Sequence, residues 1–171
     1  MIAAFDVHYV SDEQASVAAV LFREYTDSQP SLEYTALANV VSHYIPGQFY
    51  RRELPCILRV LKQFWEPPEE MVVDGYVMLG ERPGLGRHLF EAFGGRIPVI
   101  GVAKSKYRDS SGSEVFRGRS DKPLYVTSAG MDPLAAVERI KTMHGAHRVP
   151  TLLKRADLLA RGKATGYRGT G

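Results

Sequence analysis

Three acidic residues occur in the sequence where they could act together on a metal ion. Asp6 ends the apolar run of IAAFDVHY, Asp74 ends that of MVVDGY, and Glu53 lies between them in YRRELP. A buried carboxylate is costly unless it is paired or binds a metal. Carboxylate oxygens are ligands that Mg²⁺ and Mn²⁺ prefer, so the trio predicts a divalent-metal site. The alternative is that these are ordinary acidic residues at the strand ends of an α/β domain.

A divalent-metal site of this kind suits phosphodiester cleavage. The metal polarises the phosphate, lowers the pKa of an attacking water and stabilises the leaving oxygen. The chain carries a net charge of +3, and its basic residues cluster at 51–52, 104–108, 117–122 and 154–168. Such clusters suit phosphate backbones, although lysine and arginine are also common on solvated loops.

The apolar pattern predicts a mixed sheet that would position the three acids. Residues 2–10, 15–24 and 32–41 follow the pattern of consecutive strands with short connections, which favours an antiparallel meander. The other expected elements, in chain order, are a helix over 51–65, a strand in 71–79, a helix ending at Gly94–Gly95, strands in 97–104 and 123–130, and a helix over 133–144. The continuous apolar run at 97–104 is typical of a strand covered on both faces. This order is that of an α/β domain with helices on both faces of a mixed sheet.

The size and composition fit a single cytoplasmic domain. The 171 residues suffice for one core, expected over 1–162, with a flexible, basic, glycine-rich tail at 163–171. No apolar stretch approaches the roughly 18 residues of a membrane span, and no secretory signal is apparent. The single Cys56 cannot form an internal disulfide, which favours the cytoplasm.

The residues around the trio resemble those of the endonuclease V family, the deoxyinosine 3′-endonucleases. FDVHY, YIPGQFYRRELP, VVDGY, GLGRH and PVIGVAK occur in the family's order, and the similarity extends from about residue 3 to 160. The resemblance implies a ribonuclease H-like fold with Mg²⁺, for which Mn²⁺ can substitute, at the edge of the sheet. It implies no small-molecule cofactor and no membrane, and we expect a monomer.

The resemblance also implies an activity. Endonuclease V cleaves the second phosphodiester 3′ to a deaminated adenine in DNA or to inosine in RNA, so DNA, RNA or both would be the partner. Two alternatives stay open: a divergent, non-catalytic nucleic-acid-binding relative, or a nuclease with a changed substrate such as a mismatch or a flap.

Specific residues fall on the family's functional positions. Asp6, Glu53 and Asp74 match its metal-binding carboxylates, and Lys104 matches the lysine near the scissile phosphate. The positions that match nucleic-acid contacts are Tyr44, Ile45, Pro46, Gly47, Gly75, Arg82 and His88. Tyr44 is expected to stack in the strand-separating wedge. His88 could instead pack within a helix, and Arg82 could simply be solvated.

Two departures from the family pattern bear on specificity and on the metal site. The loop DGYVMLGER has Val77 where glycine is expected, and a β-branched residue there could reshape the base pocket. In AGMDP, where the family has a histidine, either Met131 replaces it or a short deletion removes it. The adjacent Asp132 either takes over as a fourth metal ligand or only caps the helix that Pro133 begins.

Overall fold

The core of the protein is a mixed seven-stranded sheet in the order β3-β2-β1-β4-β7-β9-β8. The structure is a computed structural model that describes residues 1–40, 48–108 and 112–164. The strands of this sheet are β1 (Ile2–Tyr9), β2 (Gln14–Phe22), β3 (Leu32–Asn39), β4 (Glu70–Asp74), β7 (Val99–Ala103), β8 (Ser113–Val115) and β9 (Leu124–Ala129). A small hairpin consists of β5 (Met78–Leu79) and β6 (Arg82–Pro83), and the helices are α1 (Tyr50–Leu61), α2 (Leu85–Ala92), α3 (Pro133–Thr142) and α4 (Thr151–Ala160).

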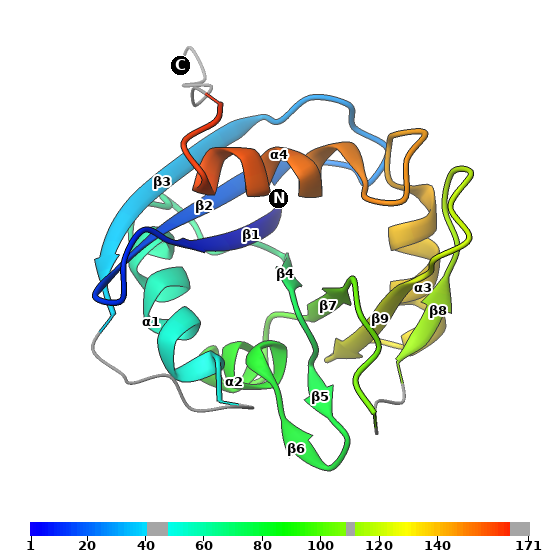
Figure 1. Cartoon of the computed structure of the whole chain (residues 1–171), viewed down its shortest axis with the longest axis horizontal. Helices are drawn as coiled ribbons and strands as arrows, with labels where there is room; N and C mark the ends of the chain where they lie inside the picture. The colour runs from blue at the N-terminus through cyan, green and yellow to red at the C-terminus, as the bar shows by residue number, and fades with distance from the viewer. Residues whose placement is uncertain (41–47, 109–111, 165–171) are drawn as a thin grey trace.

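The strand directions confirm the expected mixed α/β fold. β1, β2 and β3 form the antiparallel meander, whereas β4 pairs in parallel with β1 and with β7 (Figure 1). β9 then runs antiparallel to both β7 and β8. The carboxyl ends of β1, β4 and β7 therefore meet at one edge of the sheet, and β9 ends at the opposite edge.

Helices cover both faces of the sheet, and alternate strand residues face each layer. In β1, Ala3 and Phe5 pack with α1 and α2, whereas Ile2 and Ala4 pack with α3 and α4. This two-residue alternation is the normal geometry of a strand. Asp6 has the same parity as Ala4, so it lies on the α4 side of the sheet, just beyond the apolar core.

Some element boundaries differ from the expected ones. α1 ends at Leu61, well before the two prolines at 67 and 68, and the expected strand over 71–79 stops at Asp74. Gly75 follows with a φ of 138°, a conformation that favours glycine and turns the chain out of the sheet. The pattern analysis did not anticipate β8 or α4. The apolar residues of α4 nevertheless have helical spacing, with Leu152, Ala156, Leu159 and Ala160 buried.

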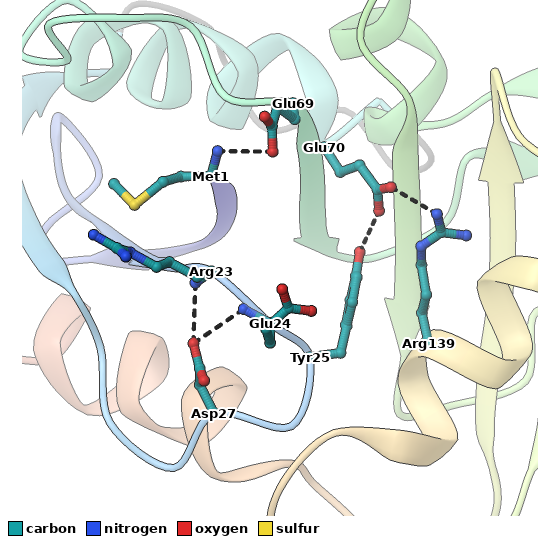
Figure 2. A network of polar contacts seen from close by, with 8 residues as sticks. All are labelled: Met1, Arg23, Glu24, Tyr25, Asp27, Glu69, Glu70 and Arg139. Atoms are coloured by element: carbon teal, nitrogen blue, oxygen red, sulfur yellow. Dashed lines mark hydrogen bonds and ion pairs between the residues drawn. The ribbon is translucent and has the colours of Figure 1, made fainter.

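A polar network ties the elements together at the edge away from the three acids (Figure 2). Glu70, the first residue of β4, accepts from the Tyr25 hydroxyl at 2.7 Å and from the Arg139 guanidinium of α3 at 2.8 Å. The Met1 amino group donates to Glu69 at 2.9 Å. These contacts anchor the starts of β1 and β4 and leave their carboxyl ends as the exposed edge.

Among the described residues, no helix is both long enough and apolar enough to cross a membrane.

Candidate active site

The parallel pairing of β1 and β4 brings the first two acids together. Phe5 is in register with Val73, so Asp6 and Asp74 occupy equivalent places at the carboxyl ends of neighbouring strands. Glu53, in the first turn of α1, reaches the same place. The three residues line one cavity of about 90 Å³. The structure therefore brings the predicted trio to one site, at the predicted edge of the sheet.

Glu53 is held by contacts from β1. The Tyr9 hydroxyl donates to Glu53 Oε1 at 3.3 Å, and the Arg52 guanidinium lies 4.4 Å from the centre of the Tyr9 ring. Arg52 also donates to the carbonyl of Asp12 at 3.2 Å. The N-terminal turn of α1 is thus fixed against β1 and the turn that follows it.

Two of the three carboxyl groups titrate far above their usual range. Burial raises the pKa of Asp6 to about 7, with the nearby charge of Asp74 adding to the effect and Lys104 opposing it. Burial likewise raises the pKa of Glu53 to about 7; the Tyr9 hydrogen bond opposes this rise, and Asp74 and Asp6 add to it. Desolvated carboxylates beside like charges disfavour ionisation, and a cation between them would reverse that preference.

Lys104 brings a positive charge next to the acids. Its Nζ lies 2.5 Å from Asp74 Oδ2, and both side chains are roughly half exposed. Burial lowers the pKa of Lys104, but the charges of Asp74, Asp6 and Asp157 outweigh this, and the net shift is upward. Lys104 therefore stays protonated beside the acids.

A fourth carboxylate, Asp157, lies in the site, and the sequence reasoning missed it. It is buried on α4 and lines a cleft of about 280 Å³ together with Asp6, Asp74 and Lys104. The signal that could have found it is an acidic residue on the buried face of a helix, between Leu152 and Leu159.

Two cations, one on α4 and one at its C-cap, hold Asp157. Lys154 Nζ lies 2.7 Å from Oδ2 and Arg161 Nε lies 2.5 Å from Oδ1. Burial alone would raise the pKa of Asp157, but these two hydrogen-bonded cations lower it to about 2. Lys154 and Arg161 also line the 280 Å³ cleft. Acidic and basic side chains therefore line this cleft together with apolar ones.

The structure contradicts the interpretation of Asp132 as a fourth ligand. β9 is antiparallel to β7, with Tyr125 opposite Ala103 and Ala129 opposite Val99. At about 3.3 Å per residue, the end of β9 lies roughly 13 Å along the sheet from the acid edge. Asp132 instead caps α3, where its Oδ1 accepts from the backbone N–H groups of Leu134 and Ala135 at 2.9 and 3.1 Å. The capping alternative is confirmed.

The donor set fits a hard divalent cation. Carboxylate oxygens from three or four side chains converge on adjoining cavities, and the raised pKa values show how poorly these groups tolerate each other's charge. In the part of the chain that the structure describes, no three His, Cys, Asp or Glu side chains are close enough to ligate one ion as they stand. Ion binding therefore requires some of these carboxylates to approach one another more closely.

The residues expected to contact nucleic acid do not gather at one place as the acids do. Tyr44, Ile45, Pro46 and Gly47 lie outside the described residues. Gly75 lines a pocket of about 470 Å³ that opens beside the acids.

Two more of these expected contacts lie on the hairpin and on α2. Arg82 is exposed on β6. The His88 ring on α2 stacks on Tyr50, with centroids 3.6 Å apart, and burial lowers the pKa of His88. His88 thus packs one helix against another, as the packing alternative anticipated.

Val77 does not shape the pocket in the way that the sequence suggested. Its side chain is buried, and its N–H donates to Thr127 Oγ1 at 2.9 Å. A Cβ on Gly86 of α2 would meet the Cγ2 of Val77 at 2.7 Å. Val77 therefore packs beneath α2, and the pocket wall in this loop is formed by Gly75, Tyr76 and Leu79.

The comparisons with known proteins agree with this geometry. The family model of endonuclease V matches residues 1–118. A protein named endonuclease V from Streptomyces avermitilis is 30% identical over 91% of this chain and 77% of its own length. The crystal structure of endonuclease V from that organism covers 94% of this chain and 79% of its own, with a TM-score of 0.77 and 28% identity.

More distant solved structures share the fold. Endonuclease V of Ciona intestinalis, in complex with a 24mer DNA containing an inosine followed by a ribo-adenosine, has a TM-score of 0.80 and 20% identity. That alignment covers 95% of this chain and 84% of the Ciona chain. The family model, the 30% identical relative and the convergence of the acids at the predicted edge lead to one conclusion: this chain belongs to the endonuclease V family of nucleases.

Proposed function

We propose that this protein is a metal-dependent endonuclease that cleaves a phosphodiester 3′ to a deaminated base in nucleic acid. The observation that carries the proposal is the convergence of Asp6, Glu53 and Asp74 on one cavity beside Lys104, in a chain of the endonuclease V family. The Ciona relative, whose structure contains inosine-bearing DNA, supports the choice of substrate.

Asp6, Glu53 and Asp74 would hold Mg²⁺, or Mn²⁺ in its place, and Asp157 is positioned to join them. The ion would polarise the scissile phosphate and lower the pKa of the attacking water. Tyr9 orients Glu53 through its hydroxyl, so the carboxylate from α1 keeps its direction although it comes from a different element than the other two. All four acids supply oxygen donors, as a hard cation requires.

The cations of the cleft would bind the substrate's phosphates. Lys104 is kept charged by Asp74 and would offset the charge that develops on the reacting phosphate. Lys154 and Arg161 lie on the rim of the same cleft, with roughly half of each side chain exposed. We assign them to flanking phosphates, because lysine and arginine provide most of the affinity of a protein for a nucleic-acid backbone.

The 470 Å³ pocket would receive the displaced base. It shares Glu53, Asp74 and Lys104 with the acid site, and aromatic residues contribute much of its wall. These aromatic residues are Phe49, Tyr50, Tyr76 and Tyr107. Aromatic faces replace the stacking that a base loses when it leaves the duplex. The stacking of Tyr44 in the predicted wedge stays a prediction, to be tested by oligonucleotide-binding measurements that respond to base stacking.

The test is cleavage of matched oligonucleotides that contain inosine or adenine at one position, in DNA and in RNA, with Mg²⁺ or Mn²⁺. We expect cuts only in the inosine strands, none in EDTA, and none with Asp74→Ala. Binding without cleavage would select the non-catalytic alternative. Equal cleavage of both strands would select a nuclease with a changed substrate.

A further inference from the structure

We propose that Arg148 is a positioning residue for Lys104, and that the buried Arg117 holds Arg148 in place. The inference rests on the proposed function, because the position of Lys104 matters only if the cleft cleaves a phosphodiester. Arg148 lies in the loop between α3 and α4, far along the sequence from Lys104. Its guanidinium nitrogen Nη2 donates to the backbone carbonyl of Lys104 and, at 2.7 Å, to that of Pro123.

These two carbonyls lie where the ladder between β7 and β9 stops. The last paired residues are Ala103 and Tyr125, so Lys104 has just left β7 and Pro123 has not yet entered β9. Without the ladder, nothing in the strand pairing fixes the backbone of Lys104. Arg148 takes the place of the next ladder hydrogen bond, because its Nη2 donates to the carbonyls at both strand ends.

The position of Arg148 is itself fixed by Arg117. Only 7% of Arg117 is exposed, and its two terminal nitrogens donate to carbonyls along the α3–α4 loop. The acceptors are the carbonyl oxygens of Met143, Gly145, His147 and Arg148. A loop whose carbonyls converge on one buried guanidinium has little freedom to move. The path of contacts therefore runs from Arg117 through the loop to Arg148, and from there to the lysine that faces the acids.

The position of Lys104 is demanding, because its Nζ must stay 2.5 Å from Asp74 Oδ2 while also facing the phosphate. A displacement of about 1 Å in a catalytic constellation can cost about 100-fold in rate. Arg148→Ala should therefore lower the single-turnover rate on an inosine-containing oligonucleotide by about that factor. Affinity for the oligonucleotide should change little, since the Nη2 of Arg148 is engaged by two backbone carbonyls of the protein.

The decisive test is a double-mutant cycle. If Arg148 acts through Lys104, then Arg148→Ala in a Lys104→Ala background should change the residual rate by no more than about twofold. Losses that multiply would overturn the proposal. Arg148→Lys keeps the charge but removes the planar guanidinium that reaches both carbonyls, and it serves if the alanine variant does not fold. Arg96→Ala is the matched control, because Arg96 donates to the carbonyl of Phe93, near the other end of β7.

A second readout does not depend on cleavage. Lysine side chains labelled with ¹³C-methyl groups give separate NMR signals, and the Lys104 signal is identified by its loss in Lys104→Arg. We expect that signal to shift or broaden in Arg148→Ala and in Arg148→Lys, but not in Arg96→Ala. An unchanged Lys104 signal would overturn the proposal even if the variants are slow. If the wild-type protein cleaves nothing, the proposed function fails and this experiment still decides the role of Arg148.

Discussion

Lys104 Nζ lies 2.5 Å from Asp74 Oδ2, and this contact joins the ends of two parallel strands. Asp74 is opposite Val102 in the pairing of β4 with β7, and Lys104 follows two residues later on the same face. The register of the sheet brings Lys104 to the side of Asp74, and the contact from Arg148 holds the Lys104 backbone just beyond the last paired residue of β7. Asp74, which could bind the metal, and Lys104, which could face the phosphate, are thus held at a fixed distance from each other.

Asp74→Asn should abolish cleavage and leave the fold intact. The change removes a negative ligand and also releases Lys104, so we expect a rate loss of about 1,000-fold or more. About 40% of the Asp74 side chain is exposed, and an exposed pair contributes at most about 1 kcal/mol, or roughly 2–4 °C in Tm. Single-turnover assays and thermal melts measure both effects. Glu138→Gln, which breaks the exposed pair with Lys141, is the control and should cleave normally.

Tyr25→Phe tests the network at the opposite edge of the sheet. The change removes the hydroxyl that donates to Glu70 at 2.7 Å, which should cost about 1.5 kcal/mol in the free energy of unfolding at pH 7. Cleavage should be unchanged, because Glu70 begins β4 whereas the acid Asp74 ends it. Urea unfolding gives the free energy, and a loss of activity at full stability would contradict the separation of the two edges.

The same variant has a predicted pH dependence. Burial, with the hydrogen bond to Glu70, raises the pKa of Tyr25. A raised pKa in the folded state means that the contribution of Tyr25 to stability is complete below its unfolded value of about 10 and is lost as the pH rises above it. The stability gap between wild type and Tyr25→Phe should therefore narrow above pH 10. A gap that stays constant from pH 7 to 11 would contradict this assignment.

The sequence predicts those site residues that directly follow the apolar run of a strand, and not those placed by strand direction or helix packing. Asp6 and Asp74 were predictable, because each closes an apolar run and parallel neighbours bring such ends together. The role of Asp132 stayed open because the apolar run of β9 does not reveal the strand's direction. Since β9 is antiparallel to β7, its last residues lie at the edge away from the acids. Asp157 was missed because only the packing of α4 across the sheet brings it near Asp6.

Gly86→Ala tests the close approach between α2 and Val77. The new methyl would meet Val77 Cγ2 at 2.7 Å and the Val77 Cα at 3.1 Å. Overpacking of this kind costs about 1–3 kcal/mol. Val77→Ala in the same chain removes the nearer atom and should restore part of the loss, so the two changes should be less than additive in urea unfolding. Strict additivity would show that α2 moves away instead.

Neither Gly86→Ala nor Val77→Ala should alter the preference for inosine, because the side chain of Val77 lies outside the 470 Å³ pocket.

Lys154→Ala and Arg161→Ala test whether the cations around Asp157 bind phosphates. Each removed phosphate contact should lower the slope of log Kd against log salt by about 0.7–0.9, and weaken binding equally for inosine and plain strands. Binding is measured by fluorescence anisotropy in EDTA, so that neither cleavage nor metal affinity contributes. Lys141→Ala is the matched control, since Lys141 forms an ion pair with Glu138 on α3 at the same three-residue spacing as Lys154 and Asp157.

Asp157→Asn separates metal binding by Asp157 from phosphate binding by its two cations. The change frees both cations, so oligonucleotide binding in EDTA should strengthen or stay constant while metal-dependent cleavage falls. An unchanged salt slope in both alanine variants would leave Lys154 and Arg161 as supports of Asp157 alone and would contradict their assignment to the substrate.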